Sequence, residues 1–296
     1  MKNRRTFLKE LAAAGAFASL GRAATDWKKQ MGLEVYTVRD LFAKDPEGTL
    51  TKVAEIGYKE IEPTEYGKMD PKQFRGLLDR LGLSAPSTHA GATDGPDLEK
   101  QLEGFQIMGI RYTEIRGGGG GGGGRGPQTV ESVKRSAEVI NKHGAIAKKF
   151  GMKMLIHNHT QEFEPLEGSK LRMFDVQLAE TDPALVAMQL DIGWASVAGQ
   201  NILEIFQKNP GRFELWHVKD ATGIKSADPK LSPNARRGVS KLVPVGQGDI
   251  DYKAIFAKAD VAGLKHFCIE QDNAAESGDS MAAAKASYQG LMKMLS

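Results

Sequence analysis

Cysteine is almost absent from this chain of 296 residues, since Cys268 is the only one. A single cysteine excludes an intramolecular disulfide, and its place inside an apolar segment predicts a buried thiol rather than a catalytic one. A large excess of charge of one sign is also missing. The chain has 40 Lys and Arg and 37 Asp and Glu, which give a formal net charge of +3. We therefore predict no basic surface for nucleic acid, and no nucleic-acid partner.

Long apolar runs are missing as well, so no stable membrane anchor is predicted. The first part of the chain has a short run, Leu11 to Leu20, that follows Asn3-Arg4-Arg5-Thr6-Phe7-Leu8-Lys9 and precedes Ala23 and Ala24. This order is typical of a twin-arginine signal, with an ordinary amphipathic helix as the alternative. We expect residues 1–24 to be an export signal read by the twin-arginine machinery, and a periplasmic or otherwise exported protein.

The chain also lacks the Gly-rich dinucleotide fingerprint that an open, doubly wound sheet would carry after its first strand. Instead, short β-rich apolar segments alternate with longer segments of helical period. Strands are expected at residues 32–37, 58–62, 84–89, 110–115, 152–158, 185–191, 213–219 and 265–270. Eight strands separated by helices predict that residues 25–296 form a single-domain (β/α)8 TIM barrel of the α/β class.

Two of the expected helices carry clear signals at both ends. One starts at Asp70-Pro71 and runs to Leu81 before Gly82, and another runs from Gln128 to Phe150 before Gly151. Proline in the first turn and glycine after the last turn are the usual punctuation of a helix.

Two connections depart from this regular alternation. Gly117 to Gly124 are eight consecutive glycines, a run that holds no single backbone conformation cheaply and lacks the Lys and Ser/Thr of a phosphate loop, so a loop at the barrel mouth is expected. The connection from Asp220 to Asp249 is rich in Lys, Arg, Pro and Gly. It is either a lid, with Arg236 or Arg237 reaching an anionic substrate, or a solvated loop.

Four of the expected strands end in side chains that can bind a metal. These side chains are His157, Asp191, His217 and Glu270. Because a parallel barrel places its chemistry at the carboxyl ends of its strands, the four ends are expected to converge on one divalent ion. Any single histidine of this kind is as well explained by a structural hydrogen bond, so the prediction depends on the four together.

The chain resembles the sugar phosphate isomerase/epimerase family of xylose isomerase-like TIM barrels. The matching segments are Gly32–Asp40, Ile156-His157-Asn158-His159, Leu190-Asp191-Ile192-Gly193-Trp194, Trp216-His217-Val218-Lys219-Asp220 and Val245–Asp251. The resemblance implies a divalent ion held by Asp191, His217 and Glu270, with His157 at a position where those enzymes have Glu. Manganese, zinc, iron or cobalt suits such a set, with manganese preferred.

The histidine at position 157 removes one of the two glutamates that exchange a proton in a two-base epimerase. Glu162 is a candidate for the missing base, and His159 for a contact with substrate or with a ligand. Glu62, His89, Tyr36 and Trp194 are further candidate substrate contacts, with core or structural roles as the alternatives. Lys219 is a candidate for stabilising an enolate oxygen, and a salt bridge to a neighbouring strand is its alternative.

These residues support a metal-dependent isomerase or epimerase that removes an α-proton from a carbohydrate, with Glu270 or Glu162 as the base. Removal of the α-proton leaves an enediolate. The alternative is a keto-glycoside lyase or dehydratase, in which this enediolate expels a β-substituent instead of taking a proton back. A non-catalytic exported sugar-binding barrel is a second alternative, and the sequence leaves a homo-oligomer open. An AP endonuclease is disfavoured because Trp194 stands where its zinc cluster would need another histidine.

Overall fold

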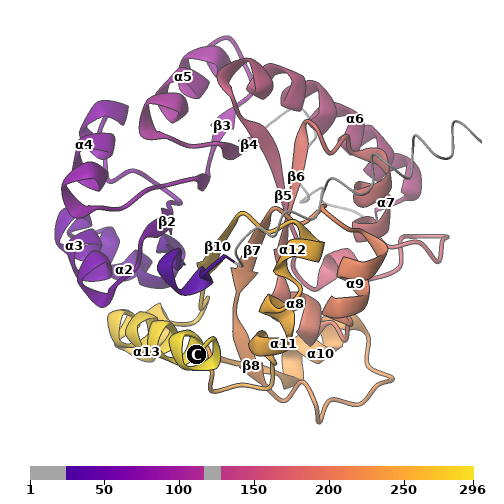
Figure 1. Ribbon diagram of the computed structural model, residues 1–296. Helices are drawn as coiled ribbons and strands as arrows, with labels where there is room; N and C mark the ends of the chain where they lie inside the picture. The colour runs from indigo at the N-terminus through magenta and orange to yellow at the C-terminus, as the bar shows by residue number, and fades with distance from the viewer. Residues whose placement is uncertain (1–24, 117–127) are drawn as a thin grey trace, which may run out of the picture.

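The computed structural model describes residues 25–116 and 128–296 of the chain. The predicted export signal, residues 1–24, and the glycine tract, residues 117–124, therefore lie outside the described residues. Figure 1 shows strands in the middle of the molecule and helices around them, in the alternation expected for a barrel.

Eight parallel strands form the central sheet, in the order β2-β1-β10-β7-β6-β5-β4-β3. Their bounds are Gly32–Glu34 (β1), Glu60–Glu62 (β2), Ser87–Thr93 (β3), Tyr112–Arg116 (β4), Lys153–His157 (β5), Val186–Asp191 (β6), Leu215–Val218 (β7) and His266–Ile269 (β10). A parallel bridge between Glu60 and Ser84 links β2 to the chain entering β3, and so closes the sheet into a barrel. The predicted single-domain TIM barrel is confirmed.

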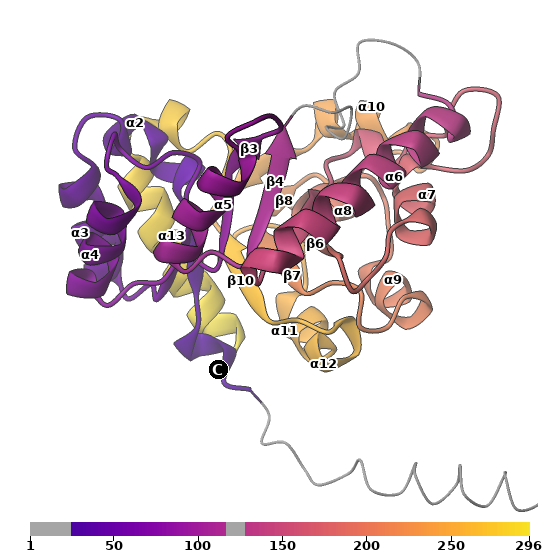
Figure 2. The same cartoon turned by 90° about the horizontal axis from the view of Figure 1, so that it is seen from above.

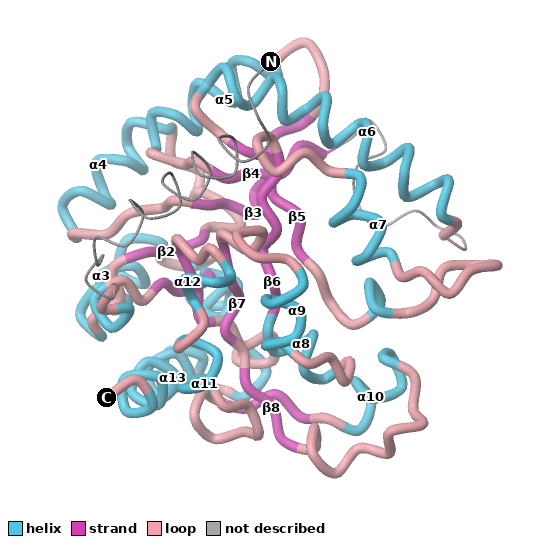
Figure 3. Tube along the Cα trace, turned by 45° about the vertical axis from the view of Figure 1, so that its right-hand side comes forward, coloured by secondary structure: helices cyan, strands magenta, loops and turns pink. Residues whose placement is uncertain are grey.

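Helices surround the strands on the outside of the barrel, as Figures 2 and 3 show. Their bounds are Arg39–Phe42 (α2), Pro46–Ile56 (α3), Pro71–Leu81 (α4), Leu98–Met108 (α5), Val130–Ala147 (α6), Met173–Glu180 (α7), Ile192–Val197 (α8), Ile202–Lys208 (α9), Pro233–Val239 (α10), Tyr252–Phe256 (α11), Ala259–Ala262 (α12) and Ser280–Met294 (α13). None of the helices in the described ranges is long and apolar enough to cross a membrane.

The predicted punctuation of α4 is confirmed in detail. The Asp70 carboxylate accepts hydrogen bonds from the backbone N–H groups of Lys72 and Gln73, and Gly82 ends the helix in the left-handed region. These contacts satisfy backbone groups that a helix leaves unpaired at its ends.

The strands are buried on both faces, as expected when helices cover a parallel sheet. All six residues of β6 are buried. Cys268 on β10 is 2% exposed, so the predicted buried thiol is confirmed. The carboxyl ends of the strands are the exception to this apolar interior, because buried charged and polar side chains gather there.

The connection from Asp220 to Asp249 is a folded unit. It contains α10 and an antiparallel hairpin of two short strands, Asp220–Thr222 (β8) and Lys241–Val243 (β9). The Asp220 carboxylate anchors it by accepting backbone hydrogen bonds of 2.9 to 3.3 Å from Ala221, Gly246, Gly248 and Ile250. A Cβ atom at Gly248 would overlap the Asp220 carboxylate, which explains the glycine there.

We predict that Asp220→Ala lowers the free energy of unfolding by about 3 kcal/mol, because buried backbone N–H groups lose their acceptor. The matched control is Asp228→Ala in the same connection, where an exposed carboxylate accepts one hydrogen bond within the described residues, from Lys230 N. The control is expected to stay within about 0.5 kcal/mol of wild type. Urea denaturation of the three proteins measures both values, and equal losses in the two variants would contradict the anchoring role.

Candidate active site

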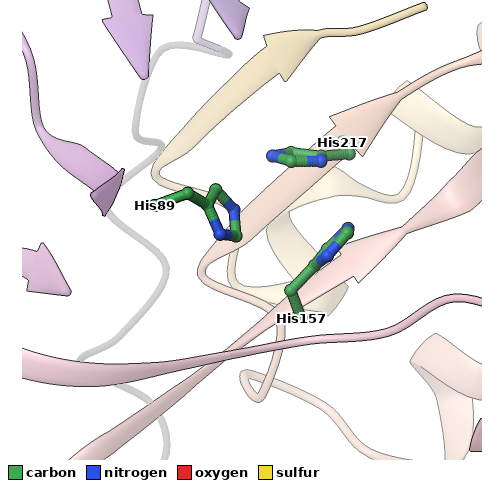
Figure 4. Close-up of side chains that lie close together, drawn as sticks. All are labelled: His89, His157 and His217. Atoms are coloured by element: carbon green, nitrogen blue, oxygen red, sulfur yellow. The ribbon is translucent and has the colours of Figure 1, made fainter. Parts of the chain in front are cut away.

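Three histidines from different strands meet at the barrel mouth. His89 lies on β3, His157 ends β5 and His217 lies on β7, and Figure 4 shows their rings turned toward one another. The ring centroids are 4.5 Å apart for His157 and His217, 5.3 Å for His89 and His157, and 5.4 Å for His89 and His217. One nitrogen from each ring lies within 4.8 Å of the others. We call these residues the histidine cluster.

Glu62, at the end of β2, lies against two members of this cluster. Its Oε2 is 2.5 Å from His217 Nε2 and 3.5 Å from His89 Nε2. Gln189 on β6 donates hydrogen bonds of 2.9 and 3.0 Å to the two oxygens of Glu62. Burial raises the pKa of Glu62, but the neighbouring charges of His89 and His217 outweigh burial and lower this pKa to about 2.

Two imidazoles of the histidine cluster, those of His89 and His157, differ in protonation state. Burial opposes the charged form of His89, yet the carboxylates of Glu62, Glu114 and Glu34 raise its pKa to about 10. The pKa of His157 lies well below its ordinary value because the ring is buried and faces the positive charges of His217 and His89. At neutral pH, a charged His89 therefore faces a neutral His157.

A buried ammonium group lies beside the histidine cluster. Lys219, directly after β7, is 0% exposed. Its Nζ lies 3.0 Å from Asp191 Oδ2, 2.8 Å from Glu270 Oε2 and 2.9 Å from Asp272 Oδ2. These carboxylates outweigh the effect of burial and raise the pKa of Lys219 well above its ordinary value. We call Lys219, Asp191, Glu270 and Asp272 the lysine cluster.

Close packing fixes the backbone of Lys219. A Cβ atom at Gly193 would overlap Lys219 Cβ, so only glycine fits at that position of α8. The Tyr252 hydroxyl donates a hydrogen bond of 2.5 Å to the Lys219 carbonyl oxygen. Gly193 and Tyr252 therefore hold the lysine in place from two sides.

The two clusters join into one ring of contacts. His217 Nδ1 lies 2.7 Å from Glu270 Oε2, and His157 Nε2 lies 3.3 Å from Asp191 Oδ2. Lys219 completes the ring by contacting both of these carboxylates. The structure thus brings together the four predicted metal ligands, and it places Lys219 against two of them.

The donors around His217 fit a divalent cation. One ligand atom from each of Glu34, His217 and Glu270 lies within 4.8 Å of the other two, and all three residues are buried. Glu34 Oε2, His217 Nδ1 and Glu270 Oε2 are buried atoms that make ion-pair contacts with one another or with Lys219, but no well-formed hydrogen bond within the described ranges. Buried carboxylate and imidazole atoms are usually satisfied by hydrogen bonds or by a metal, and nitrogen and oxygen donors suit divalent transition ions.

The other predicted site residues lie at different distances from this centre. The ring of His159 lies 4.7 Å from that of His157, and its backbone N–H donates a 2.7 Å hydrogen bond to Glu162 Oε2. Glu162 and His157 both line a cavity of about 120 Å³ between β4 and β5. The ring of Trp194 is buried, 5.4 Å from Lys219 Nζ. Tyr36 is 38% exposed and stacks under Arg39 at 4.0 Å, on the rim.

Sequence reasoning missed Glu34 and Asp272. Burial and the neighbouring Glu270 carboxylate raise the pKa of Glu34 well above its ordinary value. Glu34 ends β1, so the rule that identified the other strand ends would have found it if the strand had been predicted to stop there. Asp272 lies two residues beyond Glu270 in a loop, where no strand pattern indicates its contact with Lys219.

The pair of His89 and Glu62 predicts a pH dependence of stability in protein stripped of metal. A pKa of His89 raised from 6.5 to about 10 gives a stabilisation that is complete below pH 6.5 and is lost as the pH rises through 10. A pKa of Glu62 lowered from 4.5 to about 2 gives a stabilisation that is present above pH 4.5 and is lost toward 2.

We therefore expect the free energy of unfolding to fall more steeply between pH 7 and pH 10 in wild type than in His89→Asn. Urea denaturation after treatment with a chelator measures both curves. Parallel curves would show that His89 carries no raised pKa.

Sequence comparison with known proteins identifies a family and a relative of this chain. The sequence model of the family described as "Xylose isomerase-like TIM barrel" matches residues 50–293. An inosose dehydratase of Geobacillus kaustophilus (strain HTA426) is 26% identical over 233 residues, which are 71% of this chain and 74% of that protein.

Two solved structures share the fold. A sugar phosphate isomerase/epimerase from Parabacteroides distasonis ATCC 8503 superposes with a TM-score of 0.70 at 21% identity, over 94% of this chain and 98% of that one. The IolI protein, whose structure has a bound zinc atom, superposes with a TM-score of 0.64 at 14% identity, over 90% and 98% of the two chains.

The dehydratase is an enzyme by name, and the prediction that this chain is an enzyme is confirmed. The predicted family resemblance is confirmed as well. The match over residues 50–293 shows that the chain belongs to the xylose isomerase-like TIM barrel family.

Proposed function

We propose that this protein is a divalent-metal-dependent enzyme that removes the α-proton of a keto-sugar or keto-cyclitol and then expels a β-hydroxyl as water. One observation carries the proposal: the Glu270 carboxylate lies 2.8 Å from the buried Lys219 ammonium group, so a base and a positive charge adjoin the same reacting position. The inosose dehydratase relative supports the dehydration outcome.

The residues that would hold the metal are the four predicted ligands, His157, Asp191, His217 and Glu270, which form the ring of contacts with Lys219. Of these, His217 and Glu270 also belong to the buried set with Glu34 that fits a cation. When bound, a divalent ion polarises a ketone oxygen and makes the neighbouring C–H bond more acidic. Two imidazoles and two carboxylates suit manganese, zinc, iron or cobalt. Manganese is our first candidate, and the zinc atom in the IolI structure makes zinc the second.

The chain's own residues divide the proton transfers between them. Glu270 accepts the α-proton, and the Lys219 ammonium group stabilises the negative oxygen that develops beside it. His89, held protonated by Glu62, donates a proton to the departing hydroxyl, which leaves as water. Groups whose pKa values are pushed apart in one site commonly take such acid and base roles.

Isomerisation or epimerisation is the second candidate, and the carboxylates on either side of His217 favour it. Glu62 lies at His217 Nε2 and Glu270 at His217 Nδ1, at 2.5 and 2.7 Å. If the proton returns to the enediolate from a second carboxylate, the product is an isomer or epimer and no water is lost.

The proposed setting is outside the cytoplasm. It is supported only by the twin-arginine pattern of residues 1–24. A carbohydrate without a phosphate ester fits this setting better than an intracellular sugar phosphate.

The test is turnover of 2-keto-myo-inositol in D₂O by the manganese-loaded protein, followed by ¹H NMR. Deuterium at the former β-carbon of a product that has lost one CH–OH proton signal supports dehydration, whereas deuterium entry with no loss of water supports isomerisation or epimerisation. Glu270→Gln is expected to lower kcat by about 10³-fold, within the usual range for a lost general base.

The matched control is Glu276→Gln. Its side chain is 77% exposed and contacts Arg39 at 3.8 Å, so wild-type turnover is expected. A panel of keto-sugars and keto-cyclitols that shows neither deuterium entry nor product with wild-type protein would overturn the proposal.

A further inference from the structure

The rim of the barrel mouth carries an arginine whose donors are unused. Arg237 on α10 is exposed, and its guanidinium lies 4.4 Å from the centroid of the Trp194 ring. Within residues 25–116 and 128–296, its side chain has no carboxylate partner and no hydrogen bond. A guanidinium has five N–H donors arranged to bind an oxyanion, so this group retains its full capacity.

Three other cations near the site are already engaged. Lys219 contacts three carboxylates. Arg39 donates to the carbonyl oxygens of Tyr36 and Asp272, and Arg116 donates to that of His89 at 2.6 Å. Unlike these three, Arg237 keeps its donors available to an incoming anion within the described part of the chain.

Contacts of Trp194 and of Asn234 fix the position of Arg237. Trp194 lies beneath its guanidinium, and the same ring is 5.4 Å from Lys219 Nζ, so the indole links Arg237 to the lysine cluster. Asn234 ties α10 to the segment after β5, because its backbone N–H donates to Glu164 Oε1 at 2.8 Å and its side chain meets Thr160 Oγ1 at 2.9 Å. A donor held in place loses little entropy on binding.

The neighbouring arginine provides a contrast on the same helix. Arg236 packs against Gly199 and donates to the Leu231 carbonyl oxygen at 3.4 Å. It lines a groove on the outer side of the barrel, together with Gln200 and Asp249. The two consecutive arginines thus have different surroundings. Arg236 lines the outer groove, whereas Arg237 stacks on Trp194.

We propose that Arg237 binds an oxyanion on the substrate, so that the enzyme prefers keto-sugars that carry a carboxylate. This inference rests on the proposed function for the keto group and adds the charged group at the rim. The anion lies outside the acidic interior of Glu62, Asp191 and Glu270, where a negative charge would be repelled. A bidentate pair with Arg237 then fixes the orientation of the sugar.

Isothermal titration calorimetry of the manganese-loaded protein tests the inference without turnover. The probes are 5-keto-D-gluconate, with a carboxylate remote from its ketone, D-fructose 6-phosphate, with a phosphate, and D-fructose, which is neutral. We expect 5-keto-D-gluconate to bind wild type at least tenfold more tightly than D-fructose. Arg237→Gln is expected to abolish that preference, and Arg236→Gln to keep it.

Tighter binding of D-fructose 6-phosphate than of 5-keto-D-gluconate would show that the oxyanion is a phosphate and overturn the carboxylate preference. Equal affinity for D-fructose and 5-keto-D-gluconate, failure of all three to bind, or an unchanged preference in Arg237→Gln would overturn the inference as a whole. Because calorimetry measures binding alone, such a result leaves the deuterium experiment to judge the proposed chemistry separately.

Discussion

The burial of the Lys219 ammonium group is the interaction on which the site depends. A buried ammonium is stable only with close carboxylate partners, and Asp191, Glu270 and Asp272 supply them at 2.8 to 3.0 Å. The dependence runs both ways, because the carboxylates would repel one another without the lysine. The fold secures this arrangement through the close approach of Gly193 and the hydrogen bond from Tyr252.

The remaining features follow from the charge at this centre. Glu62 and Glu34 add further buried carboxyl groups, and the histidine cluster adds imidazoles of opposite protonation. Lys219 and the charged His89 offset part of this negative charge, and a divalent cation on the predicted ligands would offset more of it. Farther out, the folded unit anchored by Asp220 places α10 on the rim. The interior of the site is thus rich in carboxylates, and Arg237 lies on the rim.

Much of this arrangement was predictable from the sequence, because strand ends in a barrel converge whatever the details of packing. His157, Asp191, His217 and Glu270 were found in that way. Glu34 was missed because Val35-Tyr36-Thr37 has high β-propensity, so the strand was predicted to continue past Glu34. These residues instead form a 3₁₀ turn after β1. The ion pairs of Lys219 with Asp191 and Glu270 match the salt-bridge alternative for this lysine, whereas no strand pattern indicated its contact with the loop residue Asp272.

Metal content measures the central claim most directly. Elemental analysis of the purified wild-type protein, loaded with manganese or zinc and then desalted, is expected to give one equivalent of metal per chain. The variant His217→Ala/Glu270→Ala is expected to retain less than a tenth of an equivalent while keeping the circular dichroism of wild type. Wild-type protein that retains neither metal, or a folded double variant that retains a full equivalent, would contradict a metal centre at the barrel mouth.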